Sequence, residues 1–354
     1  MSLSSADLLD LLDQWEELKD LNLSIHNLTW VDATVCSGAV GHAGLLRVLC
    51  VLYVFIFLVG TTSNALVVWV TLRSDRKCAD LFVLQLAAAD LVAVATLPVS
   101  VSSLLRAGRW PFGEALCKLT HLVFSVNLFS SILFLACMSL DWYLSATRPP
   151  GGHSREPLRR LVCAAVWLLA LAAAVPETYF LQAVASVHHD GAVCRPVFPS
   201  REMMVGVQLS FTVLGFLIPF PVIAASYLAL AAALPPGSDP ARGVSRRVVL
   251  SYTVVFVVCW LPLHVVLLLD LAAPVLPFSC RLEDFLWVAL QVSQCLSMLH
   301  CCLNPVLYGL HRTYRYHLMK AFIFRYSTRS GVARLIETES ASETDVSAAD
   351  RDQI

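Results

Sequence analysis

A few polar side chains stand inside long apolar segments, and they are the residues best placed to do chemistry. Asp90 follows the apolar stretch 86–89. Amides and hydroxyls that could converge on it lie in other apolar segments, at Asn64, Asn127, Ser131 and Asn304. Two readings are open: a carboxylate that holds a sodium ion or a proton, and a hydrogen-bonded node that fixes helix packing. We expect the packing role in either case, with Asp90, Asn127 and Ser131 as candidate sodium ligands and no other metal or cofactor.

The sequence contains no recognisable catalytic set. His188-His189-Asp190 is a loop cluster that lacks the further ligands of a metal site. Neither a Ser-His-Asp arrangement nor a zinc-binding helix motif occurs. We therefore expect neither an enzyme nor a nucleic-acid-binding protein.

The elements that must position these residues are membrane-spanning helices. Of the 354 residues, 57% are hydrophobic and only 14% are charged, which is outside the range of ordinary soluble proteins. An apolar helix must be about 20 residues long to cross a bilayer. Segments of at least that length lie near 45–72, 79–105, 115–146, 159–179, 203–233, 245–273 and 283–309. The predicted fold class is all-α membrane, a seven-transmembrane helix bundle surrounded by lipid.

Basic residues predict the orientation of the bundle. Of the 25 Lys and Arg residues, 17 fall on the side of the loops after the first, third and fifth spans and 8 on the other side. The positive-inside rule then places the N-terminus outside the cell. Because residues 1–35 are polar and acidic, we expect the first span to act as its own insertion signal.

Composition divides the chain into four regions. Residues 1–40 are predicted to form an extracellular acidic arm, glycosylated at Asn22 and Asn27 within Asn-x-Ser/Thr triplets. Residues 41–310 form the seven-span domain. Residues 311–326 alternate basic and apolar side chains at helical spacing, which indicates an amphipathic helix on the inner membrane surface. Residues 327–354 are a polar stretch, predicted to be a disordered cytoplasmic tail.

Four cysteines are predicted to lie on the outer, oxidising side: Cys36, Cys117, Cys194 and Cys280. Four cysteines allow three pairings, and their spacing does not choose among them.

The apolar segments also carry a recurrent set of motifs in a fixed order. They are Gly60 through Asn64, Leu86 through Asp90, Trp167, Pro219 with Tyr227, Cys259-Trp260-Leu261-Pro262 and Asn304-Pro305-Val306-Leu307-Tyr308. In this order the chain resembles the rhodopsin-like seven-transmembrane receptors. Thr96-Leu97-Pro98 and the cysteines at 36 and 280 are similar to features of the chemokine receptors in particular.

Shorter segments look like one scavenger subfamily, the atypical chemokine receptors of type three. They are Thr120-His121-Leu122, Asn127-Leu128-Phe129, Gln294 through Ser297, His300-Cys301-Cys302 and Met319 through Phe324. The resemblance extends from about residue 36 to about residue 347 and is weaker in the N-terminal arm.

The resemblance implies two disulfides, Cys117–Cys194 and Cys36–Cys280. It also implies a basic chemokine ligand that is gripped in two stages, first by the acidic arm and then by the helical pocket. In the arm, Asp20 and Asp32 belong to a strongly acidic stretch, which would attract a cationic partner or else only solvate the arm. In the pocket the implied ligand residues are Glu177, Asp270 and Gln294, and the alternative is that they are solvated groups at helix ends.

Asp141-Trp142-Tyr143 departs from the receptor pattern, in which an arginine follows the aspartate and reaches the G protein. Tryptophan has one N–H donor and no charge, so Trp142 cannot replace that arginine, and Asp141 is expected to lack its usual cationic neighbour. The other switch residues of the resembling family are present: Trp260, Pro262, Asn304, Pro305, Tyr227 and Tyr308. We expect weak or absent G-protein activation, with neutral drift or a sequence variant at Trp142 as the alternatives.

The C-terminal tail alternates hydroxyl and acidic residues. Its predicted phosphorylation sites are Thr338, Ser340, Ser342, Thr344 and Ser347. Phosphates there would suit receptor kinases and arrestin, whereas a tail that only aids solubility is the alternative. We predict an atypical chemokine receptor of the plasma membrane and endosomes that binds and internalises its ligand. Its partners could include a second receptor, in a homo- or heterodimer. The alternative function is that of a conventional G-protein-coupled chemokine or peptide receptor. A membrane transporter or channel is less favoured.

Overall fold

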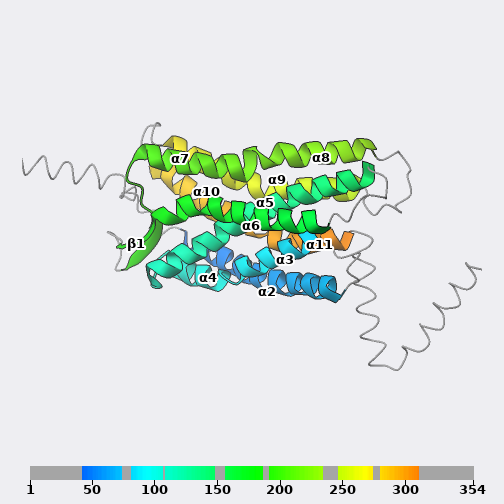
Figure 1. The fold of residues 1–354 in the computed structure, drawn as a ribbon. Coiled ribbons are helices and arrows are strands. Elements are labelled where there is room, and N and C mark those ends of the chain that lie inside the picture. Colours follow the sequence, from blue (N-terminus) through cyan, green and yellow to red (C-terminus); the bar gives the residue numbers. More distant parts are fainter. Residues whose placement is uncertain are drawn as a thin grey trace, which may run out of the picture.

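Seven helical spans run side by side along one axis, as the ribbon in Figure 1 shows. The computed structural model describes residues 42–73, 81–106, 108–147, 156–185, 191–233, 246–273 and 280–310. Each span in this part of the chain is long and apolar enough to cross a membrane. The predicted seven-helix fold class is confirmed. The arm, the predicted surface helix at 311–326 and the tail, with their glycosylation and phosphorylation sites, lie outside the described residues.

Four spans are single helices: α2 (Ala43–Arg73), α5 (Gly113–Thr147), α6 (Glu156–Phe180) and α9 (Arg246–Ala272). The other three are interrupted. The second span consists of α3 (Leu81–Val94) and α4 (Leu97–Leu105), and the seventh of α10 (Cys280–Met298) and α11 (His300–Leu310). In the fifth span, α7 (Arg201–Thr212) and α8 (Pro219–Ala233) flank the π-helical turn η2 (Val213–Leu217). All seven agree with the predicted apolar segments to within a few residues.

The interruptions have identifiable causes. Pro98 lacks an amide hydrogen, and Thr96 donates its hydroxyl to the Ala93 carbonyl at 2.7 Å, so the second span bends between α3 and α4. In α11, Pro305 cannot donate to the carbonyl of Cys301 one turn earlier. The amide nitrogen of Asn64 in α2 donates to that carbonyl instead, at 2.7 Å. Asn64 therefore ties the first span to the seventh at the point where the proline has removed a backbone donor.

Burial separates central helices from peripheral ones. In an apolar stretch of 18 residues in each helix, 61% of the α5 stretch is buried inside the bundle, against 22% of the α6 stretch. Leu128, Ile132 and Phe134 of α5 join Phe256 and Trp260 of α9 in the main apolar core. Helix α6 instead exposes leucines along its length, as expected of a helix with one side toward lipid. The third span is therefore the axis of the bundle.

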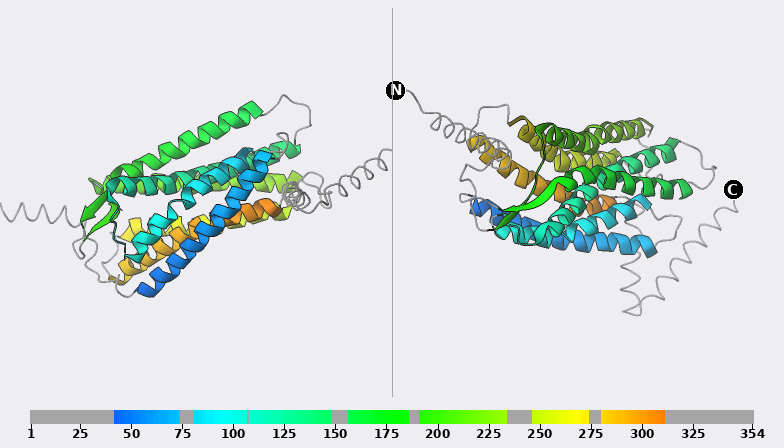
Figure 2. Two further views of the ribbon diagram at one scale, coloured as in Figure 1. Left: turned by 90° about the horizontal axis from the view of Figure 1, so that it is seen from below. Right: turned by 60° about the vertical axis from the view of Figure 1, so that its left-hand side comes forward.

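Two antiparallel strands, β1 (Leu181–Ala185) and β2 (Ala192–Pro196), cap one end of the bundle, and Figure 2 shows them there from two further directions. We call this the hairpin end, which the basic residues predict to face outward. A disulfide joins Cys117 of α5 to Cys194 of β2, which confirms one of the two pairings that the resemblance implied. Trp110 adds a backbone bond to the Ala192 carbonyl at 2.7 Å. Cys36 and the side chain of Cys280 lie outside the described residues, so that pairing stays a prediction.

Candidate functional site

Three helices meet at Asp90, which is fully buried near the middle of the bundle. The carboxylate of Asp90 in α3 accepts a hydrogen bond from Asn127 Nδ2 of α5 at 3.1 Å on Oδ1. Its other oxygen, Oδ2, accepts one from Asn304 Nδ2 of α11 at 3.0 Å. The structure thus brings Asp90, Asn127 and Asn304 together, as the sequence analysis expected. This node fixes the second, third and seventh spans to one another.

The other two residues expected at this node lie differently. Asn127 Nδ2 also lies 3.4 Å from Ser131 Oγ, so Ser131 contacts Asp90 only through that amide. Among the described residues Asn64 makes no hydrogen bond to Asp90, and its amide nitrogen donates instead to the carbonyls of Gly60 and Cys301. Sodium binding by Asp90, Asn127 and Ser131 stays a prediction.

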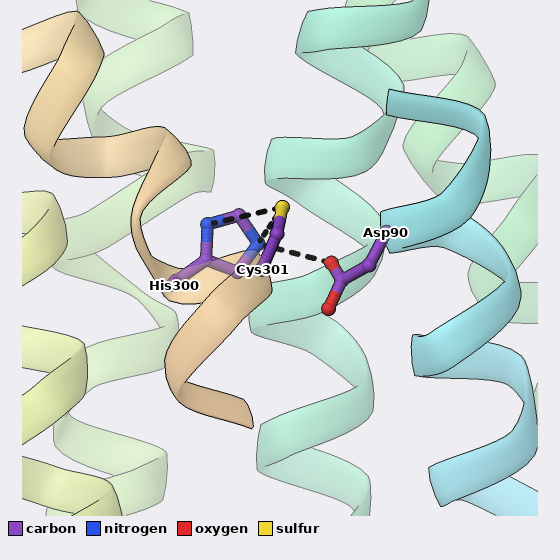
Figure 3. Close-up of side chains that lie close together, drawn as sticks. All are labelled: Asp90, His300 and Cys301. Atoms are coloured by element: carbon purple, nitrogen blue, oxygen red, sulfur yellow. Dashed lines mark hydrogen bonds and ion pairs between the residues drawn. The ribbon is translucent and has the colours of Figure 1, made fainter. Parts of the chain in front are cut away.

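Two buried side chains at the node were not proposed as site residues from the sequence: His300 and Cys301 (Figure 3). His300 Nε2 lies 3.2 Å from Asp90 Oδ1, and Cys301 Sγ lies 3.7 Å from His300 Nε2. The available signal was the spacing of His300 and Asn304, since residues four apart share one face of a helix. Here that face of α11 is the one that points toward Asp90.

The three residues predicted to bind ligand lie on three different helices. Glu177 of α6 is half-buried and accepts a hydrogen bond from Ser125 of α5 at 3.4 Å. Gln294 of α10 is partly buried, and Asp270, near the end of α9, is exposed. In the part of the chain that the structure describes, none of the three is hydrogen-bonded to either of the others. Asp20 and Asp32 of the arm lie outside the described residues.

The predicted switch residues are mostly buried. Trp260 of α9 is 1% exposed, and its ring centroid lies 4.7 Å from that of His300. Tyr308 is buried in the main core, and Pro262 and Pro305 lie within α9 and α11. Tyr227 belongs to α8, but its side chain lies outside the described residues. Trp260 and the Asp90 node are therefore adjacent through His300.

At the opposite end of the bundle, Asp141 of α5 has a cationic partner that the sequence analysis did not foresee. Arg159 of α6 donates from Nη2 to Asp141 Oδ2 at 2.6 Å and from Nε to Oδ1 at 3.2 Å. Asp141 lacks the usual arginine at position 142, as expected, but its carboxylate is paired with a different arginine. The arginine comes from the next span instead of the next residue. The backbone of Trp142 belongs to α5, and its side chain lies outside the described residues.

Comparison with known proteins identifies the family. The sequence pattern described as 7 transmembrane receptor (rhodopsin family) matches residues 63–308, which include Asp90, Asp141, Trp260 and Tyr308. The chain belongs to the rhodopsin family of seven-transmembrane receptors. Among these receptors it is 46% identical over 332 residues to human atypical chemokine receptor 3, which covers 90% of this chain and 91% of that protein. It is 36% identical over 270 residues to bovine C-X-C chemokine receptor type 3, which covers 73% and 72%.

A third relative within the rhodopsin family is the rat G-protein coupled receptor 182, with 35% identity over 324 residues that cover 89% of this chain and 79% of the relative. These findings make the chain a chemokine receptor of the rhodopsin family and a multi-pass protein of the plasma membrane. They also confirm that it is a receptor and not an enzyme. A transporter or channel finds no support among these relatives.

Proposed function

We propose that this receptor captures a basic chemokine and carries it into the cell with the help of receptor kinases and arrestin, with little or no G-protein activation. The observation that carries the proposal is at the inner switch. The position after Asp141 is tryptophan, and the carboxylate of Asp141 is held by Arg159 of another helix.

The inner switch lacks the group that a G protein would meet. An arginine at position 142 would supply a permanent charge and five donors on α5, and Trp142 supplies neither the charge nor the fork of donors. Arg159 does not stand in for that arginine, because its guanidinium is on another helix and is paired with Asp141 through Nε and Nη2. The predicted inner end of α5 therefore has no charge at position 142, and its carboxylate at position 141 is paired with Arg159 of α6.

Acidic residues at the hairpin end favour the proposal of a basic ligand. Glu177 and Asp270 place carboxylates on α6 and α9, and Gln294 adds an amide on α10. The arm before Cys36 carries seven acidic residues and one lysine, with Asp20 and Asp32 nearest the first span. Long-range attraction between opposite charges raises the rate of association, and salt weakens it. The proposed ligand is a chemokine whose basic surface meets the arm and whose N-terminal segment reaches these pocket residues.

The proposed output is internalisation through the tail. The sites Thr338, Ser340, Ser342, Thr344 and Ser347 would each gain about 1.5 to 2 negative charges on phosphorylation. Such a strip of charge suits the basic grooves of arrestin. In this proposal the internalised receptor and its chemokine are delivered to endosomes. The N-terminus of the receptor lies outside the cell and carries glycans at Asn22 and Asn27.

The test compares the native receptor with Trp142→Arg in one cell line, for a panel of chemokines. G-protein dissociation, arrestin recruitment and loss of chemokine from the medium are recorded together. Depletion with arrestin recruitment and no G-protein response is the expected result. A strong G-protein response from the native receptor would overturn the proposal.

A conventional G-protein-coupled receptor is the second candidate, because the remaining switch parts are in place. Trp260 and Tyr308 are buried in the core, and Asn304 is bonded to Asp90. Under this alternative the native receptor would dissociate G proteins at the same chemokine concentrations that recruit arrestin.

A further inference from the structure

His264 of α9 is buried in the core without a hydrogen bond. It is 1% exposed, and neither Nδ1 nor Nε2 has a hydrogen-bond partner among the described residues. An imidazole carries at least one N–H, whichever tautomer it adopts. A buried donor is therefore unpaired in this arrangement, which costs free energy. The ring lies instead against the aromatic carbons of Phe211 and Phe216, at centroid distances of 5.9 and 5.3 Å.

Thr212 of α7 is a second buried polar side chain without a partner. It is 2% exposed, and its Oγ1 has no hydrogen-bond partner within the described part of the chain. A threonine inside a helix can donate to the carbonyl one turn earlier, as Thr120 of α5 does to Leu116 at 2.8 Å. The hydroxyl of Thr212 makes no such bond, so it is a second unpaired group in the core.

These two groups belong to facing sides of the fifth and sixth spans. Gly215 and Phe216 follow Thr212 by three and four residues, so they lie on the same side of the helix. Both lie against His264, because the Phe216 ring contacts the imidazole and a Cβ on Gly215 would be 3.0 Å from its Cε1. The lack of a side chain at Gly215 thus lets the imidazole approach the side of the span that carries Thr212.

The backbone hydrogen bonding of the fifth span changes directly after Thr212. The turn η2 is π-helical, and the Ile218 amide donates to the Val213 carbonyl at 3.0 Å. Pro219 has no amide hydrogen, so the Gly215 carbonyl loses the donor that a continuous α-helix would give it. Helices bend at π-turns and at prolines. A small displacement of α7 against α9 can therefore take place at this point with little loss of backbone hydrogen bonding.

We propose that Thr212 and His264 form a latch between the fifth and sixth spans. The latch is open in this arrangement and closes with a hydrogen bond between the two side chains when a chemokine binds. Closure pairs two buried groups that are otherwise unpaired, so it lowers the free energy of the closed arrangement. A ligand that favours the closed arrangement then binds more tightly than it would without the latch.

A further contact connects the latch to the pocket. Gln208 lies four residues before Thr212, on the same side of α7, and a side-chain hydrogen bond joins it to Asp270 of α9. Asp270 is one of the residues to which the proposed function assigns the basic ligand, so the inference rests on that function. A basic group of the ligand competes with Gln208 for the carboxylate of Asp270. Helix α7 is then released at Gln208 and is able to bring Thr212 to His264.

The test measures two quantities for Thr212→Val, His264→Phe and the double variant. Valine and phenylalanine keep the branching or the ring of the native side chains and remove their polar atoms. The first quantity is the thermal unfolding midpoint of the purified, ligand-free receptor in lipid nanodiscs. Because each substitution removes an unpaired buried group, we expect each midpoint to rise by about 2–4 °C and the two gains to add.

The second quantity is the dissociation constant of a labelled chemokine, chosen from the panel above as one that the native receptor removes from the medium. Each single variant lacks the bond that closes the latch, so its affinity should fall about fivefold to tenfold. The double variant should bind no more weakly than either single variant, because all three lack the same bond. Ser210→Ala is the matched control and should change neither quantity, since the Ser210 hydroxyl donates within α7 to the Val207 carbonyl at 2.7 Å.

The two quantities can each overturn the latch. Ligand-free midpoints that do not rise, or gains that do not add, would mean that Thr212 and His264 are already paired. Affinity losses that multiply in the double variant, or no losses, would mean that no bond forms on binding. If His264→Phe folds poorly, Thr212→Val alone still gives both quantities. A native receptor that removes no chemokine would overturn the proposed function and the latch together, whereas failure of the latch alone appears only in the variants.

Discussion

Arg159 of α6 holds Asp141 of α5 through two hydrogen bonds, although the two residues lie 18 positions apart on different spans. The guanidinium and the carboxylate meet as a bidentate pair, the geometry that makes such contacts strong and directional. Their side chains are 35% and 18% exposed, so the pair is only partly screened by solvent. The third and fourth spans are thereby fixed together at the end of the bundle opposite the hairpin end.

Removing Arg159 should destabilise the receptor more than removing its neighbour. Arg159→Leu leaves the half-buried Asp141 without its partner, and we expect a loss of about 1–2 kcal/mol in the free energy of unfolding. Arg160 forms an exposed ion pair with Glu156, so Arg160→Leu should change stability by less than about 0.5 kcal/mol. Thermal unfolding of the purified variants measures both. Equal losses in the two variants would mean that the ion pair of Arg159 with Asp141 stabilises the receptor no more than the exposed pair of Arg160 with Glu156.

Restoring an arginine at position 142 should not by itself restore signalling. In Trp142→Arg, Asp141 would be shared between the introduced arginine and Arg159, and α5 would still be fixed to α6. We expect the double variant Trp142→Arg with Arg159→Leu to give a larger G-protein response than Trp142→Arg alone. Dissociation of G-protein subunits at saturating chemokine measures the difference, with Trp142→Arg plus Arg160→Leu as the control. A single variant as active as the double one would show that the ion pair does not restrain the switch.

Asn64 should be more important for stability than its neighbours in α2. Asn64→Ala removes the donor that replaces the missing amide of Pro305, and the buried carbonyl of Cys301 would be left without a partner. The expected loss is about 1–3 kcal/mol. The Ser63 hydroxyl donates to the carbonyls of Val59 and Gly60 within its own helix, so Ser63→Ala should change the free energy of unfolding little. The comparison of unfolding midpoints would contradict this account if both variants behaved alike.

The fifth span contains a position where one methyl group should be harmful. A Cβ on Gly215 of η2 would lie 3.0 Å from His264 Cε1 and 3.2 Å from a methyl of Leu128, both in the core. Gly215→Ala should therefore cost about 1–3 kcal/mol through overpacking. Gly206 of α7 has nothing within 4 Å of such a Cβ, and Gly206→Ala should stabilise by up to about 1 kcal/mol. Surface yield and thermal unfolding of the pair test the contrast.

Neutralising Glu177 should weaken chemokine capture. Glu177→Gln keeps the shape and the contact with Ser125 but removes a charge from the pocket, and we expect affinity to fall about fivefold to tenfold, by about 1 kcal/mol. Glu114 is exposed at the hairpin end and is paired with Lys118, so Glu114→Gln serves as the charge-matched control. Binding of labelled chemokine at two salt concentrations gives both values. If the control lost as much affinity as Glu177→Gln, general surface charge would account for the effect.

The sequence by itself determined the seven spans, because a bilayer demands about 20 apolar residues per helix wherever the chain crosses it. It also determined the motif positions, from Asp90 to Tyr308, that carry the family, and through the resemblance the Cys117–Cys194 disulfide. The interruptions near Thr96 and Pro219 could be anticipated from proline, which lacks the amide that continues a helix.

Only the tertiary structure decided which polar side chains meet. Asp141 is paired with an arginine of α6 and not with one at position 142. His300 and Cys301 lie beside Asp90. Asn64 donates to the Cys301 carbonyl and not to Asp90. Each of these contacts depends on how far one helix is rotated and shifted against another. Packing of side chains across the whole bundle sets that rotation and shift. The apolar length of a helix places it in the membrane, but this length is the same however the helix is rotated about its axis. Apolar length therefore does not determine which side chains face each other.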